Sequence, residues 1–203
     1  LLRSDGQPVQ IGGTEKMARS KNNGVARQTR VHRYGADTVR LFSMFAAPPE
    51  QSLEWNESGV EGMARFLRRL WRDVHAHVAQ PDHPEVDANA LDAAQKTLRR
   101  LTHEAIQKVG DDYGRRHSFN TAIAALMELL NHVGKFSDMS DQGRAVRHEA
   151  FEAIVLLLNP ITPHISHALW QVLGHPETLL EDLPFPNADP AAMVRDALTL
   201  AVQ

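Results

Sequence analysis

A chain of 203 residues with 42% hydrophobic and 23% charged side chains has the composition of an ordinary globular protein and is long enough to bury a core. It contains no cysteine, which excludes disulfides and thiolate metal sites and leads us to expect a cytoplasmic protein. No apolar run is long enough to span a bilayer, no signal peptide is recognisable, and Leu1 in place of methionine leads us to expect an excised fragment.

Charge is distributed unevenly along the chain. Residues 1–40 carry eight Lys and Arg against three Asp and Glu, whereas residues 41–203 carry fourteen against twenty-two. The two balances, +5 and −8, sum to the formal net charge of −3. Because cations collected in one segment repel one another, we predict that the N-terminal fifth meets an anion. The larger part can bind nucleic acid only through local basic faces.

The first predicted elements are a hairpin and a loop. Residues 1–13 contain two glycine-bearing turns around short apolar stretches, which is typical of a β-hairpin. Residues 15–24 then read E-K-M-A-R-S-K-N-N-G and place Lys16, Arg19 and Lys21 within six residues. A bound polyphosphate explains such a cluster, because a cationic loop can close over it and neutralise its charge. A solvated basic turn is the alternative interpretation.

The rest of the chain is predicted to be helical. Apolar spacing and helix stop signals predict helices over 36–47, 59–78, 91–113, 119–133, 146–158 and 163–173, with a polar loop at 137–143 and an irregular tail from 175. We expect Ser118 and Thr162 to be N-caps, and Leu53 and Trp55 to be buried anchors in a connector. The buried side of helix 59–78 is predicted to comprise Val60, Met63, Ala64, Leu67, Leu70, Trp71, Val74 and Val78, and that of helix 91–113 to comprise Ala94, Leu98, Leu101, Ala105 and Val109.

Two groups of arginines are candidates for contact with a nucleic-acid backbone. Arginines spaced by three, four and seven residues share a helix face. The candidates are Arg65, Arg68, Arg69 and Arg72 on helix 59–78, and Arg115 with Arg116 after helix 91–113. A solvated helix face is the alternative for these residues.

Eleven histidines raise the question of a metal site. The pairs His75 with His77 and His164 with His167 lack an acidic partner at the usual spacing, so the sequence predicts no protein-bound metal. No Ser/His/Asp arrangement, phosphate-binding Walker loop or dinucleotide-binding glycine motif is present either.

Five sequence blocks, taken together, resemble one protein family. They are K-M-A-R-S-K-N-N-G-V at 16–25, R-Y-G-A-D-T-V-R-L-F at 33–42, L-E-W at 53–55, S-G-V-E-G at 58–62 and N-P-I-T-P-H at 159–164. The first resembles the K-M-S-K-S loop of class I aminoacyl-tRNA synthetases. The order of all five is similar to that in the leucyl-tRNA synthetases of class Ia, and the resemblance covers nearly the whole chain.

The resemblance implies a fold and a set of roles. It implies a mainly α fold, an antiparallel helical bundle with a small N-terminal hairpin and loop, divided into the end of a catalytic domain at 1–50 and a tRNA-binding domain at 51–203. Lys16 and Arg19 would be catalytic cations, and Lys16, Met17, Arg19 and Ser20 would bind ATP, whose Mg²⁺ is carried by the nucleotide. The expected partner is the leucine-specific tRNA, and we expect a monomer. The H-I-G-H motif, the leucine pocket and the editing domain of the family are absent from these residues. We therefore predict that the chain alone makes no leucyl-adenylate.

Two loop positions depart from the family. Ala18 stands where the family has a small hydroxyl residue, and Arg19 stands where it has a second lysine. Arginine keeps the charge but has a different shape from an ammonium group. These departures leave open a non-catalytic helical interaction module with a degenerate loop. A valine, isoleucine or methionine enzyme is a further alternative, against which the K-N-N-G letters at 21–24 argue.

Overall fold

The computed structural model describes residues 13, 15–18, 27–48 and 50–194, with the side chains of 27–29 excluded. Over these residues the chain is helical and contains no strand, which confirms the predicted mainly α fold. The helices are α1 (Arg27–Tyr34), α2 (Ala36–Phe45), α3 (Glu57–Val78), α4 (Ala93–Asp111), α5 (Phe119–Lys135), α6 (Asp141–Leu158) and α7 (Pro163–Val172), with short turns η2 (Asp112–Arg116), η3 (Leu180–Asp182) and η4 (Ala191–Met193). None of the helices in the described part combines the length and the apolar character that crossing a membrane requires.

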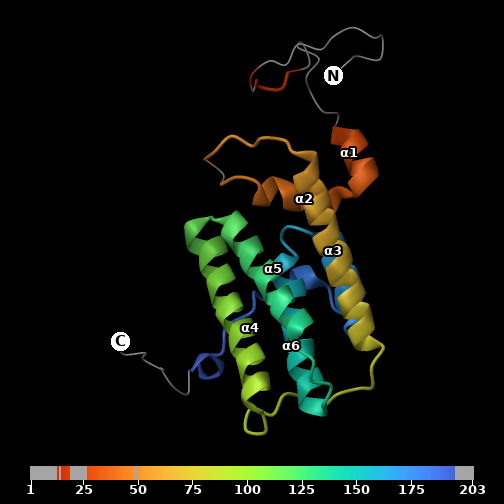
Figure 1. The fold of residues 1–203 in the computed structure, drawn as a ribbon, viewed down its shortest axis with the longest axis vertical. Helices are drawn as coiled ribbons and strands as arrows, with labels where there is room; N and C mark the ends of the chain where they lie inside the picture. Colours follow the sequence, from red (N-terminus) through yellow and green to blue (C-terminus); the bar gives the residue numbers. More distant parts are fainter. Residues whose placement is uncertain (1–12, 14, 19–26, 49, 195–203) are drawn as a thin grey trace.

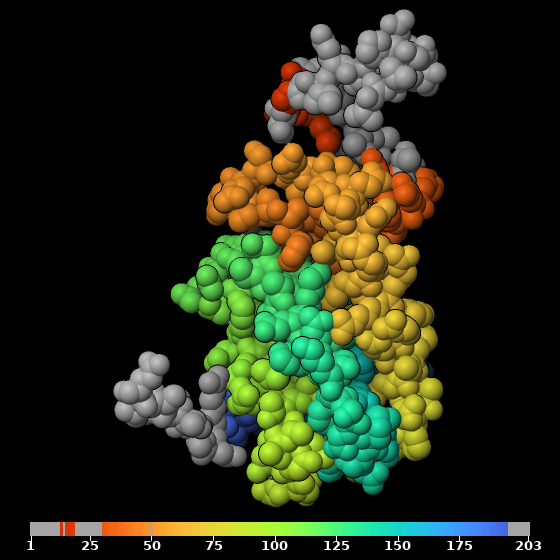
Figure 2. Space-filling model, in the orientation of Figure 1, coloured from red at the N-terminus to blue at the C-terminus, as the bar shows by residue number. Residues whose placement is uncertain are grey.

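The long helices form a bundle that α1 and α2 cover at one end. Figure 1 shows α4, α5 and α6 side by side along the long axis, with α3 beside them and α2 lying across their upper ends. In the space-filling view, the orange segment that contains α1 and α2 caps the helices drawn in green and yellow (Figure 2). The N-terminal helices are therefore packed onto the bundle.

One hydrophobic core runs through the whole bundle. Leu41 and Phe42 of α2 belong to the same buried cluster as the apolar faces of α3 to α7. The ring of Phe42 also meets the ring of Trp55 edge to face, with centroids 5.0 Å apart. The predicted division of the chain at residue 50 stays a prediction, although packing continues across that position.

Helix starts follow the capping residues. The side chains of Asn56 and Ser140 accept backbone hydrogen bonds from the third residues of α3 and α6. Asp92 forms a reciprocal capping box with Gln95 at the start of α4. Ser118 and Thr162 occupy the predicted N-cap positions, but neither side chain makes a capping hydrogen bond.

Some boundaries differ from the sequence-based expectation. Helix α6 begins at Asp141, inside the predicted loop 137–143, because Ser140 caps it there. The end of the predicted helix 91–113 continues as the π-helical turn η2, in which the wider turn carries two arginines. Helix α1 was not predicted, because its eight residues include few apolar ones.

Four residues that were predicted to be buried are exposed. Trp71 and Val78 are each 40% exposed, because they stand at the edge of the apolar stripe of α3. Leu53 is 42% exposed in the connector, whereas Trp55 is partly buried as predicted. Ala94 is exposed in the first turn of α4, before that helix reaches the core.

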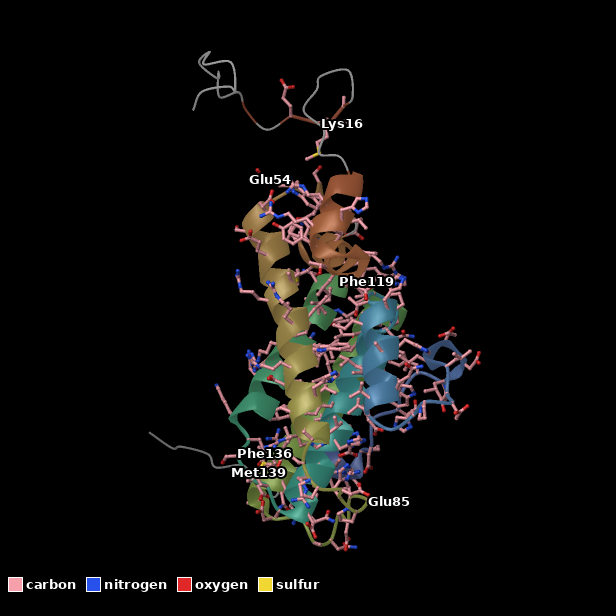
Figure 3. All side chains as sticks on the ribbon, turned by 90° about the vertical axis from the view of Figure 1, so that its right-hand side faces the viewer. Lys16, Glu54, Glu85, Phe119, Phe136 and Met139 are labelled. Atoms are coloured by element: carbon pink, nitrogen blue, oxygen red, sulfur yellow. The ribbon has the colours of Figure 1, made fainter. Side chains whose placement is uncertain are left out.

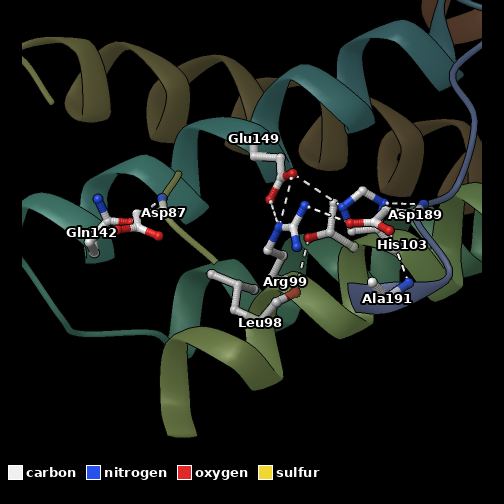
Figure 4. A network of polar contacts seen from close by, with 9 residues as sticks. Asp87, Leu98, Arg99, His103, Gln142, Glu149, Asp189 and Ala191 are labelled. Atoms are coloured by element: carbon white, nitrogen blue, oxygen red, sulfur yellow. Dashed lines mark hydrogen bonds and ion pairs between the residues drawn. The ribbon is translucent and has the colours of Figure 1, made fainter. Parts of the chain in front are cut away.

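A polar network links α4 and α6 to the C-terminal segment (Figure 4). Arg99 Nε lies 3.2 Å from Glu149 Oε2, and Arg99 Nη2 lies 3.0 Å from Asp189 Oδ2. His103 Nε2 lies 3.1 Å from Glu149 Oε1, and His103 Nδ1 accepts a hydrogen bond from the backbone N–H of Asp189. The arginine charge is thus offset by two carboxylates, and the segment around Asp189 is held against the bundle.

Candidate nucleic-acid interface

The outer face of α3 carries the first group of predicted arginines. Arg65, Arg68 and Arg72 are exposed, and their spacing of three and four residues places them on one side of the helix. Buried residues such as Leu67, Leu70 and Val74 face the opposite side. Because the apolar face of α3 packs against the core, these guanidinium groups lie on the solvent side, as predicted from the sequence.

Arg65 and Arg68 keep their charge unneutralised. Within the described part of the chain, neither forms an ion pair or a hydrogen bond. Glu61 lies one turn before Arg65, but its carboxylate faces Arg33 Nη2 at 3.8 Å and the hydroxyl of Tyr34 at 3.3 Å. Arg68 has no acidic residue at three or four positions on either side. The two guanidinium groups therefore present full positive charge to solvent.

Arg69 and Arg72 are placed differently. Arg69 points toward α5, where its Nη2 donates to the carbonyl of Leu130 at 3.0 Å and its Nη1 donates to Oδ1 of Asn131. Its Nε also lies 3.3 Å from Asp73 Oδ2. Arg72 is 73% exposed but pairs with Oδ1 of the same Asp73 at 2.9 Å. Arg69 thus joins two helices, and the charge of Arg72 is partly offset.

Arg115 and Arg116 lie in the π-helical turn η2, and both face carboxylates. Arg115 Nε and Nη2 donate to Asp111 at 2.6 and 2.9 Å, and this contact lowers the pKa of Asp111. Arg116 Nη1 lies 3.3 Å from Oδ1 of the buried Asp112. Both arginines are largely exposed, yet each already has an anionic partner. They are weaker candidates for a phosphate than Arg65 and Arg68.

A groove adjoins Arg68. It has a volume of about 680 Å³ and lies where α2, α3 and α7 meet, with Arg33, Arg68, Trp71 and His164 on its walls. Trp71 is partly exposed, and the centroid of its ring lies 4.4 Å from that of the His75 ring. An aromatic face beside guanidinium groups suits a stacked base or a sugar-phosphate backbone.

The wall of this groove is held by Asp37. The Asp37 carboxylate is buried, and it accepts hydrogen bonds from the backbone N–H of Ile165 at 2.7 Å and from His164 Nδ1 at 2.8 Å. It therefore satisfies a free N–H at the start of α7 and fixes the exposed imidazole of His164 at the rim. The sequence did not single out Asp37 or Trp71 for this role, because the groove joins three helices far apart in the chain.

The N-terminal edge of the groove is a charged cluster around Glu57. Its carboxylate accepts hydrogen bonds from Arg30, Arg33 and Tyr34, and the contacts with Arg30 and Tyr34 lower the pKa of Glu57. The Arg33 guanidinium also stacks over the Tyr34 ring, 4.9 Å from its centroid. This cluster fixes α1 against the start of α3.

The predicted ATP loop lies only partly in the described residues. Arg19, Ser20 and Lys21, and the predicted hairpin over 1–13 apart from Gly13, fall outside them. Lys16 and Met17 are exposed, and Figure 3 shows Lys16 beyond α1, at the end of the molecule opposite Glu85 and Met139. The loop and the tRNA-binding assignments stay predictions.

Comparison with known proteins gives one consistent result. Residues 95–202 match the family model described as the anticodon-binding domain of tRNA ligase. The chain is 75% identical over 202 residues to the leucine–tRNA ligase of Stenotrophomonas maltophilia strain R551-3, and 73% identical over 203 residues to that of Xanthomonas axonopodis pv. citri strain 306. Both alignments cover 100% of this chain and 23% of the relative, so the chain spans about a quarter of the length of the curated relatives that it matches.

A solved structure gives the same fold. It is the ternary complex of the agnB2 LeuRS of Agrobacterium radiobacter K84 with tRNA and LeuAMS, which matches with a TM-score of 0.77 and 26% identity over 88% of this chain and 23% of that chain. The family model covers more than half of the residues, and the structural match extends to most of the rest. The chain therefore belongs to the family of anticodon-binding domains of tRNA ligases.

Proposed function

We propose that the chain works as part of a leucine–tRNA ligase, which activates leucine with ATP and transfers it to the leucine-specific tRNA. The observation that carries this proposal is the 75% identity to a leucine–tRNA ligase, which extends over the full chain. The bundle would dock the tRNA, and residues outside this chain would supply the leucine pocket. The protein would act in the cytoplasm as a monomer.

In this proposal the tRNA backbone lies along the outer face of α3. Arg65 and Arg68 are exposed and have no anionic partner in the described part of the chain, so a phosphate can pair with them without displacing an existing ion pair. The groove beside Arg68 adds Trp71 and His164 as surfaces for a base or ribose. The solved relative was crystallised with tRNA, which supports the same kind of partner here.

The N-terminal loop would act on ATP. Leucine's carboxylate attacks the α-phosphate in line and pyrophosphate leaves, so negative charge develops on the phosphates during the step. Lys16 and Arg19 would stabilise that charge when the loop closes, and Met17, Ser20 and backbone amides would help to position the nucleotide with its Mg²⁺. Glu15, Lys16 and Met17 of this loop are exposed, as residues that close over a ligand need to be.

A chimaera tests this function most directly. The chain replaces the matching segment of the Stenotrophomonas maltophilia ligase, and leucine-dependent ATP–pyrophosphate exchange and tRNA leucylation are measured. We expect both activities in the chimaera and neither in the isolated chain. A folded chimaera without exchange activity would contradict the proposal, as would exchange by the isolated chain.

Ala18 and Arg19 favour a second candidate, a non-catalytic helical module that binds tRNA or protein and has a degenerate loop. The double change Ala18→Ser with Arg19→Lys in the chimaera separates the two. A working variant loop predicts similar exchange rates before and after the change. A degenerate loop predicts an inactive chimaera whose activity the double change restores.

A further inference from the structure

Imidazoles and one carboxylate gather where α6 meets the segment that follows α7. His148 and Glu152 lie one turn apart on α6, and His175 follows the turn that ends α7. His148 Nε2 lies 3.3 Å from Glu152 Oε1, and His175 Nε2 makes a short contact with the same oxygen. One donor atom from each residue lies within 4.8 Å of the other two. Three potential ligands of a metal ion are thus brought to one point.

The spacing of His148 and Glu152 suits zinc, and His175 has to move away from Glu152 to reach the same geometry. Zinc binds histidine nitrogen and carboxylate oxygen at about 2.0–2.2 Å in tetrahedral geometry, which places neighbouring ligand atoms roughly 3.3 Å apart. The separation of 3.3 Å between His148 Nε2 and Glu152 Oε1 equals that value. Two imidazoles with one carboxylate also form a ligand set that suits zinc among the biological divalent cations.

His148 has the kind of outer hydrogen-bond partner that orients a metal-binding histidine. His148 Nδ1 lies 3.2 Å from Nε2 of His77, while its Nε2 faces Glu152. A neutral imidazole has one N–H for these two contacts. Without a cation, His77 Nε2–H donates to His148 Nδ1 and His148 Nε2–H donates to Glu152; with a cation on Nε2 of His148, its Nδ1–H donates to Nε2 of His77. His77 then serves as the outer partner that orients the ligand ring.

The ligand side chains are held in place before any ion arrives. The His175 ring stacks on Trp170, with centroids 3.9 Å apart and an angle of 14° between the planes. Gly174, with a φ of 106°, ends α7 and turns the chain toward α6. The side chains of His148, Glu152 and His175 are 17%, 27% and 34% exposed, so an ion can reach them from solvent.

A neighbouring group of histidines is a poorer cation site. His77, His83 and His148 also bring three nitrogens within 4.8 Å of one another. That group contains no carboxylate. Because a dication gains from an anionic ligand, the group that contains Glu152 is favoured.

We propose that His148, Glu152 and His175 bind one Zn²⁺ ion, with water as the fourth ligand. The ion links α6 to the segment that follows α7. This site is independent of the proposed function. The sequence-based expectation of no metal considered histidine pairs close in the chain, whereas His175 comes from another element, 23 residues after Glu152.

Zinc binding by the full chain tests the proposal. The protein is stripped with a chelator, and Zn²⁺ alone is titrated by calorimetry, with the metal content measured after dialysis. We expect one ion per chain, a higher melting temperature with Zn²⁺, and a tetrahedral absorption spectrum when Co²⁺ replaces it. Glu152→Gln and His175→Gln should each weaken binding roughly tenfold or more and abolish the shift in melting temperature.

Two control variants keep the test decisive. His132→Gln removes a partly exposed histidine whose Nε2 lies 4.0 Å from Glu128 Oε1 on α5, and His83→Gln removes a member of the neighbouring group. Both should bind Zn²⁺ as the unmodified chain does, and circular dichroism verifies that every variant is folded. The proposal fails if the unmodified chain binds no stoichiometric zinc, or if Glu152→Gln and His175→Gln still bind it. It fails equally if His83→Gln loses the ion.

Discussion

Arginine has opposite roles on the outer face of α3 and in the network between α4 and α6. Arg99 is 15% exposed and lies between the carboxylates of Glu149 and Asp189. Arg65 and Arg68 are exposed, and neither has a carboxylate partner in the described residues. The first arrangement holds protein segments together, whereas the second leaves charge available for an external anion. Whether an arginine has a carboxylate partner therefore decides if it holds the fold together or is a candidate for RNA binding. The number of arginines on a face decides less.

A large effect on stability is expected from Arg99→Met. The change leaves Glu149 and Asp189 partly buried without their cation, so we expect a loss of about 2 kcal/mol in the free energy of unfolding. Urea denaturation measures it, and the affinity for tRNA should not change. Arg65→Met is the matched control and should stay within about 0.5 kcal/mol of the unmodified chain. If Arg99→Met and Arg65→Met lose the same free energy of unfolding, the paired arginine stabilises the fold no more than the exposed one, and the comparison between the two regions fails.

A pair of glycines compares the inner and outer sides of α3. A Cβ at Gly59 would lie 2.7 Å from Cε2 of the buried Phe42 ring, so Gly59→Ala should destabilise the chain by about 1–3 kcal/mol. A Cβ at Gly62 meets nothing closer than 3.8 Å, so Gly62→Ala should stabilise it by about 0.5–1 kcal/mol through helix propensity. The shift in urea midpoint checks both. If both changes stabilise the chain, the Phe42 ring can move away from the new Cβ at little cost in free energy.

Much of this fold could be predicted from the sequence, because the helices of the bundle carry regular apolar spacing and clear stop signals. Gly174 ends α7 as predicted, with the positive φ that glycine permits. The edge residues Trp71 and Val78 were assigned to the buried stripe, because periodicity defines a direction and not the width of the neighbouring helix. Helix α1 lacked an apolar pattern and could not be predicted in this way.

The candidate site was predicted less completely. The exposed arginines of α3 followed from helix geometry, and the pairing of Arg115 with Asp111 follows from spacing of four residues. The partner of Arg69 is 62 residues away on α5, so no local pattern indicated that it links two helices. The groove with Trp71 and His164 likewise depends on how α2, α3 and α7 meet.

Removing the unpaired charge should weaken tRNA binding. We expect the double variant Arg65→Gln with Arg68→Gln to bind a leucine-specific tRNA about tenfold more weakly at low salt, because two phosphate contacts are lost. Fluorescence anisotropy with labelled tRNA measures the affinity. The urea midpoint should remain that of the unmodified chain. Unchanged affinity in a folded variant would make this face a solvated surface only.

The smallest effect is expected at the paired arginines of η2. Arg115→Gln with Arg116→Gln removes the same amount of charge, but both side chains already face Asp111 and Asp112. The tRNA affinity should fall by less than about threefold, since their charge is locally offset. The same anisotropy assay makes the comparison. A loss as large as that of the α3 double variant would show that pairing does not decide which arginines bind.

The dependence of tRNA affinity on salt concentration tests the central claim most directly. The logarithm of the affinity is plotted against the logarithm of the salt concentration for the unmodified chain and the two double variants. Each lost phosphate contact should reduce the magnitude of the slope by about 0.7–0.9, so Arg65→Gln with Arg68→Gln should lower it by about 1.4–1.8, while the η2 variant leaves it nearly unchanged. Equal slopes for all three proteins would contradict the account.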